Sequence, residues 1–153
     1  MNMKGFTLVE TMISMLILSV VLLGVYGVLN TGQKVCAKDF VLLEVQEQAR
    51  NAMARIVKDV RQSSAATITV ISASNHRLTF TIPSATGVQY YLNGTNLVRE
   101  FPAGTMVNVA SNIGLLTFTQ TGTILQIQVR ADKAFFSSTT SFSLVEKVRL
   151  RNE

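Results

Sequence analysis

The sequence is poor in the residues from which most enzyme and metal sites are built. It contains one histidine, His76, and one cysteine, Cys36. A lone cysteine cannot form a disulfide within the chain, and no cysteine cluster or Gly-rich phosphate loop accompanies the histidine. Asp39, Asp59 and Asp132 are far apart in the sequence, whereas calcium needs several oxygen ligands in one loop. We therefore expect no enzymatic activity, no cofactor and no metal.

Charged residues are also scarce, at 15% of the chain, and the formal net charge is +5. Lys and Arg occur singly rather than in runs, so the sequence does not indicate a dedicated nucleic-acid-binding surface. Hydrophobic residues make up 48% of the 153 residues, and one apolar segment accounts for part of that excess. Outside this segment the chain is long enough for one modest domain.

The apolar segment covers residues 6–29 and contains a single charged residue, Glu10. It exceeds the roughly 20 residues needed to cross the hydrocarbon core of a bilayer. A carboxylate inside a membrane helix costs about 2.5–3.5 kcal/mol, so we expect Glu10 to be functional and to need a cationic partner. The next basic residue, Lys34, lies beyond the segment, so the partner should come from another molecule. By the positive-inside rule Lys4 lies on the cytoplasmic side and everything after residue 29 lies outside.

The residues at the start of this segment resemble those of type IV pilin-like proteins. In that family a short basic leader ends in glycine, and Phe-Thr-Leu-Val-Glu then opens a hydrophobic helix; here the leader is residues 1–5 and Glu10 closes the motif. The resemblance implies that a prepilin peptidase/methyltransferase cuts after Gly5 and methylates the new amine of Phe6. It also implies that Glu10 neutralises the N-terminal amine of a neighbouring subunit in a helical filament, which fits the need of a buried charge for an opposite one.

Other interpretations of the N-terminus are less consistent with the residues. A secretory signal would end in small residues of the A-x-A kind, and residues 28–33 offer no such site. Acylation of Cys36 as a lipoprotein would need small apolar residues before it, but Gln33, Lys34 and Val35 stand there. An uncleaved single-pass anchor remains open.

No proline precedes Pro83, so one helix can extend from residue 6 to about residue 62, with residues 6–29 as the transmembrane and assembly part and residues 30–62 as an amphipathic part. Arg55 and Asp59 are four residues apart and are expected to pair weakly on its polar side. The apolar stripe, spaced by three and four, is Leu42, Val45, Ala49, Ala52, Ile56 and Val60; the polar side is Glu44, Glu47, Gln48, Arg50, Asn51, Arg55, Lys58, Asp59 and Arg61.

Gly24 and Gly27 interrupt the apolar segment, and two explanations are open. In many major pilins a proline occupies the position of Gly27, and this part of the helix is thought to loosen in the filament. Glycine costs about 1 kcal/mol of helix stability relative to alanine, so it can have a similar effect. Alternatively, the two glycines let neighbouring helices approach closely in the membrane.

Residues 63–153 change to an alternating pattern of β-branched and aromatic residues, which predicts an antiparallel β domain packed on the apolar stripe of the helix, an α+β fold. Asn93-Gly94 is a hairpin signal. Tyr90 and Tyr91 should point to opposite faces of their strand, one in the core and one exposed. The expected strands are residues 67–71, 77–82, 88–92, 96–101, 115–119, 124–130 and 142–150.

Residues 45–62 and the following β domain resemble W-type minor pilins and J-type minor pseudopilins of type II secretion. The presence of Glu10 argues against the large tip pseudopilin, and the isolated Asp132 and Glu146 argue against the calcium loop of the major pseudopilin. We therefore predict a low-abundance priming subunit, a minor pilin of a type IV pilus. The alternatives are a minor pseudopilin of type II secretion or DNA uptake and, more distantly, a membrane-anchored binding domain such as a tip adhesin.

The expected partners follow from this function. They are the prepilin peptidase/methyltransferase, other pilins or pseudopilins, an inner-membrane assembly platform and the lipid bilayer, with no specific nucleic acid. The protein should be a single-pass inner-membrane protein before assembly, with its C-terminal domain outside, and then part of a pilus or pseudopilus.

Overall fold

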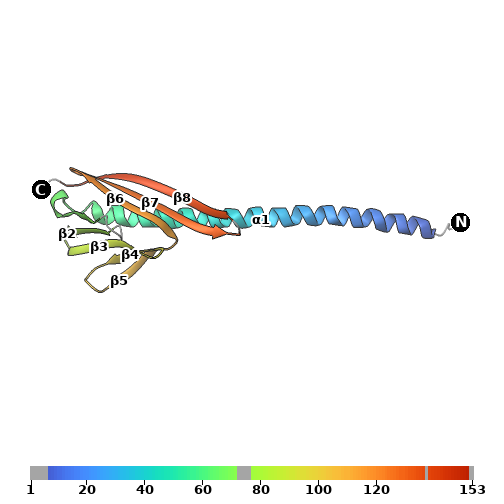
Figure 1. Ribbon diagram of the computed structural model, residues 1–153, viewed down its shortest axis with the longest axis horizontal. Coiled ribbons are helices and arrows are strands. Elements are labelled where there is room, and N and C mark those ends of the chain that lie inside the picture. Colours follow the sequence, from blue (N-terminus) through green and yellow to red (C-terminus); the bar gives the residue numbers. More distant parts are fainter. Residues whose placement is uncertain (1–6, 72–76, 137, 152–153) are drawn as a thin grey trace. The chain divides into compact units, whose positions relative to one another are not determined.

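The computed structural model describes residues 7–71, 77–136 and 138–151. The chain divides into two compact units, residues 1–39 and residues 40–153. The first unit holds the N-terminal part of helix α1 (Leu8–Val60), and the second holds the rest of α1, a short 3-10 helix η1 (Ala65–Thr67) and the strands (Figure 1). The expected α+β class, one long N-terminal helix followed by antiparallel strands, is confirmed.

Helix α1 ends at Val60, close to the expected end at about residue 62. The Ser63 hydroxyl donates to the Val60 carbonyl at 2.7 Å, and the Ser63 amide donates to the same oxygen at 3.0 Å. Serine offers the backbone this alternative to the helical hydrogen bond, which explains why the helix stops here. Ser63 is fully buried, whereas Arg61 and Gln62, which form the turn before it, are exposed.

The strands form two sheets, whereas the sequence pattern predicts a single antiparallel β domain without this division. The first sheet has the order β1-β2-β3-β4-β5, and every neighbouring pair is antiparallel. The Asn93-Gly94 hairpin is confirmed: Asn93 pairs with Asn96, and Gly94 has a φ of +62°, which glycine adopts without strain. The strands are β1 (Thr69–Ile71), β2 (Arg77–Ile82), β3 (Ala85–Asn93), β4 (Asn96–Glu100) and β5 (Met106–Ala110).

Strand β5 is missing from the predicted strands, for a physical reason. It is an edge strand, and Met106, Val107 and Asn108 at its start are exposed. Without burial on one face, the sequence does not alternate between apolar and polar residues, which is the pattern used to recognise a half-buried strand.

The second sheet has the antiparallel order β6-β7-β8. Its last two strands contain 12 residues each and are longer than predicted. The added parts are rich in polar residues such as Asp132, Lys133 and Thr139, which conceal the strand pattern. The strands are β6 (Ile113–Thr121), β7 (Ile124–Phe135) and β8 (Ser138–Arg149).

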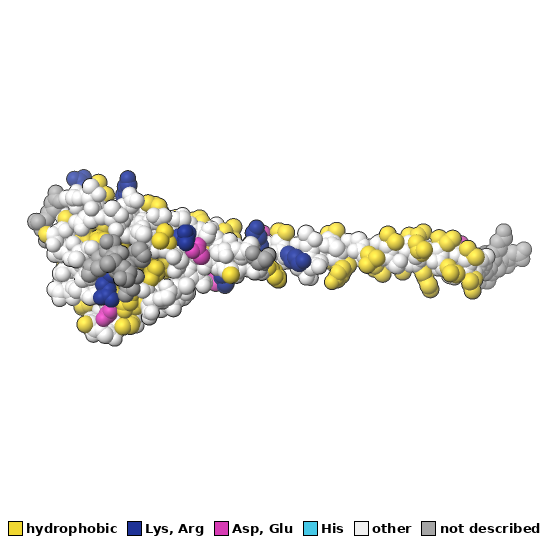
Figure 2. Space-filling view, in the orientation of Figure 1, with side chains coloured by type: hydrophobic (Ala, Val, Ile, Leu, Met, Phe, Trp, Pro, Cys, Tyr) yellow, Lys and Arg dark blue, Asp and Glu magenta, His cyan; other side chains and the backbone are white. Residues whose placement is uncertain are grey.

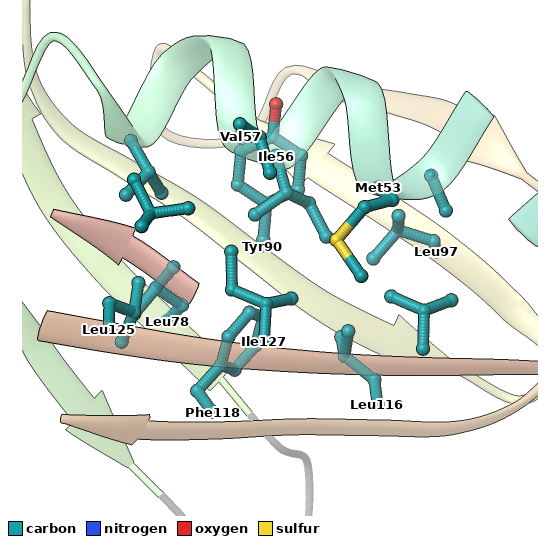
Figure 3. Packing of buried hydrophobic residues seen from close by; sticks show 14 of the residues in the cluster. Met53, Ile56, Val57, Leu78, Tyr90, Leu97, Leu116, Phe118, Leu125 and Ile127 are labelled. Carbon is teal, nitrogen blue, oxygen red and sulfur yellow. The ribbon is translucent and has the colours of Figure 1, made fainter. Parts of the chain in front are cut away.

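Both sheets share one hydrophobic core with the helix in the second unit. In Figure 3 the side chains of Met53 and Ile56 point from the helix towards residues of both sheets. Most of the predicted stripe is fully buried, although Leu42 is only half-buried. Burying one large apolar side chain contributes about 1.5–3 kcal/mol, so this stripe is what holds the helix on the sheets. Its fully buried members are Val45, Ala49, Ala52, Ile56 and Val60.

Two predictions about polar and aromatic residues are wrong. Tyr90 is 0% and Tyr91 7% exposed, so both rings are buried, and Arg77 covers the Tyr91 ring at 4.8 Å from its centroid. Asp59 is 6% exposed and does not lie on a solvated polar side with Arg55. Its actual partners belong to the five-stranded sheet.

Candidate functional site

The N-terminal part of α1 exposes mainly apolar side chains. Leu8, Leu23 and Val28 are 76%, 71% and 74% exposed, and hydrophobic side chains cover this stretch in Figure 2. Continuous apolar surface of this extent marks contact with a membrane or another protein. In the described part of the chain α1 is long and apolar enough, by length and composition, to cross a bilayer. Together with the motif reported below, this suggests membrane anchoring.

Hydroxyl side chains in the N-terminal part of α1 donate hydrogen bonds to backbone carbonyls of the same helix. A lone hydroxyl in hydrocarbon is unfavourable, but a bond to a carbonyl one turn earlier removes the penalty without a partner helix. These residues are therefore compatible with the interior of a membrane. The bonds are from Thr11 to Leu8 at 2.8 Å, Ser14 to Glu10 at 2.8 Å, Ser19 to Leu16 at 2.7 Å and Thr31 to Gly27 at 2.9 Å.

Glu10 lies in the first turn of α1 and is exposed. Its amide donates to the carbonyl of Thr7 at 3.1 Å and contacts the Thr7 hydroxyl oxygen at 3.3 Å. The first turn is the positive end of the helix dipole, which favours a carboxylate there. Within the described residues the Glu10 carboxylate forms no hydrogen bond or ion pair. Gly5 and Phe6, the predicted cleavage and methylation positions, lie outside the described residues.

Gly24 and Gly27 lie inside α1, which is helical through both positions. A Cβ atom added at either glycine, or at Gly32, would meet nothing within 4 Å. These glycines line a shallow, mainly apolar groove of about 690 Å³ together with Thr31 and Cys36. Loosening of the helix in a filament and close approach of a second helix both stay predictions.

A buried polar cluster that was not predicted from the sequence joins α1 to the five-stranded sheet. Asp59 Oδ2 accepts a hydrogen bond from the Tyr90 hydroxyl at 2.8 Å and another from Arg99 Nε at 2.8 Å. Burial, and then the bond to Asp59, raises the pKa of Tyr90. Burial alone would lower the pKa of Arg99, but the hydrogen bond and the negative charge of Asp59 raise it. We call these three residues the Asp59 cluster.

The spacing of Asp59 was the available signal for this cluster. It follows Ile56 by three residues and Ala52 by seven, which places it beside the apolar stripe on the same face of the helix. Asp59 was predicted to lie on the solvated side because it is charged. The direction of a side chain, however, is set by its position along the helix. A carboxylate placed there needs a cationic partner in the sheet, and Arg99 provides it.

Residues 1–26 match the model of the prokaryotic N-terminal methylation motif. No curated protein and no solved structure matches the chain. The matched residues include Gly5, Phe6 and Glu10, and the motif implies processing by a prepilin peptidase and assembly with other pilins. The motif and the helix-on-sheet fold support the resemblance of the chain to the type IV pilin-like proteins.

Proposed function

We propose that the protein is a minor pilin, a low-abundance priming subunit of a type IV pilus. It enters the inner membrane as a prepilin with its C-terminal unit outside, is cleaved after Gly5, is methylated on Phe6, and assembles through residues 6–29. Its role is structural rather than catalytic. The observation that carries the proposal is Glu10, the single carboxylate of the apolar segment, which lies in the first turn of α1 where the helix bears the methylation motif and exposes its apolar side chains.

Cleavage and the position of Glu10 fit together chemically. Removal of the leader would create a cationic amine on Phe6 at the edge of the apolar segment. Within a bundle of apolar helices this amine and the Glu10 carboxylate of a neighbouring subunit would each be unfavourable alone, and they stabilise each other when paired. Assembly out of the bilayer therefore selects a subunit that carries the acid.

The choice of a minor pilin is supported by the resemblance of residues 45–62 and the β domain to W-type minor pilins. The resemblance to J-type minor pseudopilins supports the second candidate, a minor pseudopilin of type II secretion. The two differ in where the filament lies: a pilus can be sheared from the cell surface, and a pseudopilus remains in the envelope.

The test is the intact mass and N-terminal sequence of the protein from membranes and from sheared surface filaments. A minor pilin begins at Phe6 with one added methyl group and is present in the sheared fraction. A processed protein confined to membranes would favour the pseudopilus. A chain that still begins at Met1 in cells with the peptidase would overturn both candidates.

Glu10→Val provides the second test. This variant should be cleaved normally but recovered in filaments at a level lower by about tenfold or more, because a lost pairing of about 1.4 kcal/mol already gives tenfold. Asp39→Asn is the matched control, since it removes an exposed carboxylate from the same helix beyond the apolar segment. Unchanged incorporation of Glu10→Val would contradict the charge-pairing account.

A further inference from the structure

A pocket of about 300 Å³ lies in the second unit, where α1 faces strands β4 and β5. Asn51 and Arg55 line it from the helix, Arg99 from β4, and Val107 and Val109 from β5. It combines two guanidinium groups and an amide with apolar walls. This is the composition of a site that binds an anionic group attached to an apolar or extended chain.

The charges around the pocket leave it positive. Arg99 gives its Nε hydrogen to Asp59, but within the described residues its terminal amino groups and the Arg55 guanidinium form no hydrogen bond. The nearest acid along β4, Glu100, follows Arg99 in the strand and so points to the opposite face, where it accepts a hydrogen bond from the Gly104 amide at 2.8 Å. Two cations and one carboxylate therefore surround the pocket, and a second carboxylate would neutralise it.

The edge of the sheet beside this pocket is open. Strand β5 pairs only with β4 among the described strands. The Phe101 amide donates to the Thr105 carbonyl at 3.1 Å, so by the alternation of an antiparallel ladder the amides of Met106 and Asn108 point away from β4. Met106 and Val107 are 59% and 51% exposed. Such an edge offers backbone donors and acceptors to an incoming strand.

We propose that β5 and this pocket form a docking site for an extended segment of a partner protein that carries an aspartate or glutamate. The segment pairs with the free edge of β5 and places its carboxylate between Arg55 and Arg99. Its backbone supplies affinity and the acid supplies register and selectivity, as in other cases of strand addition. The proposal goes beyond the role of a filament subunit and does not depend on it, because every residue involved lies in the second unit.

The charge of the segment is tested with the full chain in detergent micelles. The probe is a fluorescently labelled peptide of about eight alternating Thr and Val residues with one central Asp, a length that matches a typical strand. The same peptide with Asn in place of Asp is the comparison. We expect the Asp peptide to bind more tightly by about tenfold, which is the loss expected for one charge-assisted hydrogen bond. Equal binding of the two peptides, or binding of neither, would overturn the proposal.

Variants test the two halves of the site separately. Arg55→Gln should weaken binding of the Asp peptide by about tenfold and leave the Asn peptide unaffected, whereas Lys58→Gln, which removes an exposed charge three residues away on the same helix, should change neither. Met106→Pro removes an outward amide on an exposed edge position and should abolish binding, while Met106→Thr keeps the amide and the binding.

A phosphate-bearing partner would give a different pattern. A phosphate group can also bind to two arginines, but its binding does not require pairing with the backbone amides of β5. If oligothymidylate binds, loses affinity in Arg55→Gln and is indifferent to Met106→Pro, while the Asp peptide does not bind, the pocket is an anion site for nucleic acid and the docking proposal is wrong.

Discussion

Replacing Asp59 by alanine should destabilise the second unit more than any change at an exposed charge. The Asp59 and Arg99 side chains are 8% and 15% exposed, and Asp59 also accepts the Tyr90 hydroxyl. Truncation would leave a guanidinium and a hydroxyl without their acceptor in a largely buried place. Removing one partner of a buried pair costs about 3–5 kcal/mol. Because Arg99 also lines the open pocket, we expect the lower end, about 3 kcal/mol.

The measurement is urea unfolding of the full chain in detergent micelles, followed by the dispersed methyl resonances of the core. Lys58→Ala is the matched control, because this neighbouring side chain is exposed and should change stability by less than about 0.5 kcal/mol. Asp59→Asn should lose about half as much as Asp59→Ala, since hydrogen bonds to a charged acceptor are about twice as strong as neutral ones. A loss below about 1 kcal/mol for Asp59→Ala, the value of an exposed ion pair, would refute the account of Asp59 as a buried junction.

Two further predictions concern pH and packing. The raised pKa of Tyr90 means that the unfolded chain loses this proton near pH 10, the ordinary value, while the folded chain keeps it, so stability should fall by about 1.4 kcal/mol per pH unit above that point. Urea unfolding at about pH 9 and pH 11 should therefore show that the stability advantage of the wild type over Tyr90→Phe becomes smaller as pH rises. A difference in stability that stays constant between the two pH values would contradict this. At Gly114, an added Cβ would overlap the carboxylate of Asp132, which accepts Arg130 Nε at 2.9 Å. Gly114→Ala should lose about 1–3 kcal/mol of unfolding free energy, most of it recovered in Gly114→Ala/Asp132→Ala, and an equal loss in both would show that the carboxylate is not the obstacle.

The parts of the fold that depend on local chemistry could be predicted from the sequence. The helix and its buried stripe follow from spacings of three and four, and the β3–β4 hairpin follows from Asn93-Gly94. The end of the helix lies two residues before the expected position. In each case the deciding interaction lies within a few residues along the chain, so the pattern is visible in one sequence.

The parts that depend on long-range packing could not be predicted. Alternation identifies a strand but does not say which sheet it joins, so the split into β1–β5 and β6–β8 was not visible. Tyr91 is buried because Arg77 from the neighbouring strand covers its ring, which no local pattern encodes. The partners of Asp59 lie 31 and 40 residues away along the chain.

The same distinction applies to function. The N-terminal motif could be recognised because its residues, from Gly5 to Glu10, are consecutive in the sequence. The pocket on β5 could not, because Arg55 and Arg99 come together only after the helix packs on the sheet.

Arg99 connects the core and the surface of the second unit. Its Nε donates a hydrogen bond to Asp59, which joins the end of the helix to the sheet, and the same side chain lines the pocket. The stability of the unit and the geometry of the proposed docking site are therefore coupled through one side chain. Arg55 is the better probe of docking, because it lines the same pocket on an exposed part of the helix and takes no part in the Asp59 cluster. An effect of Asp59 variants on peptide binding without an effect of Arg55→Gln would mean that the pocket responds to packing rather than to charge.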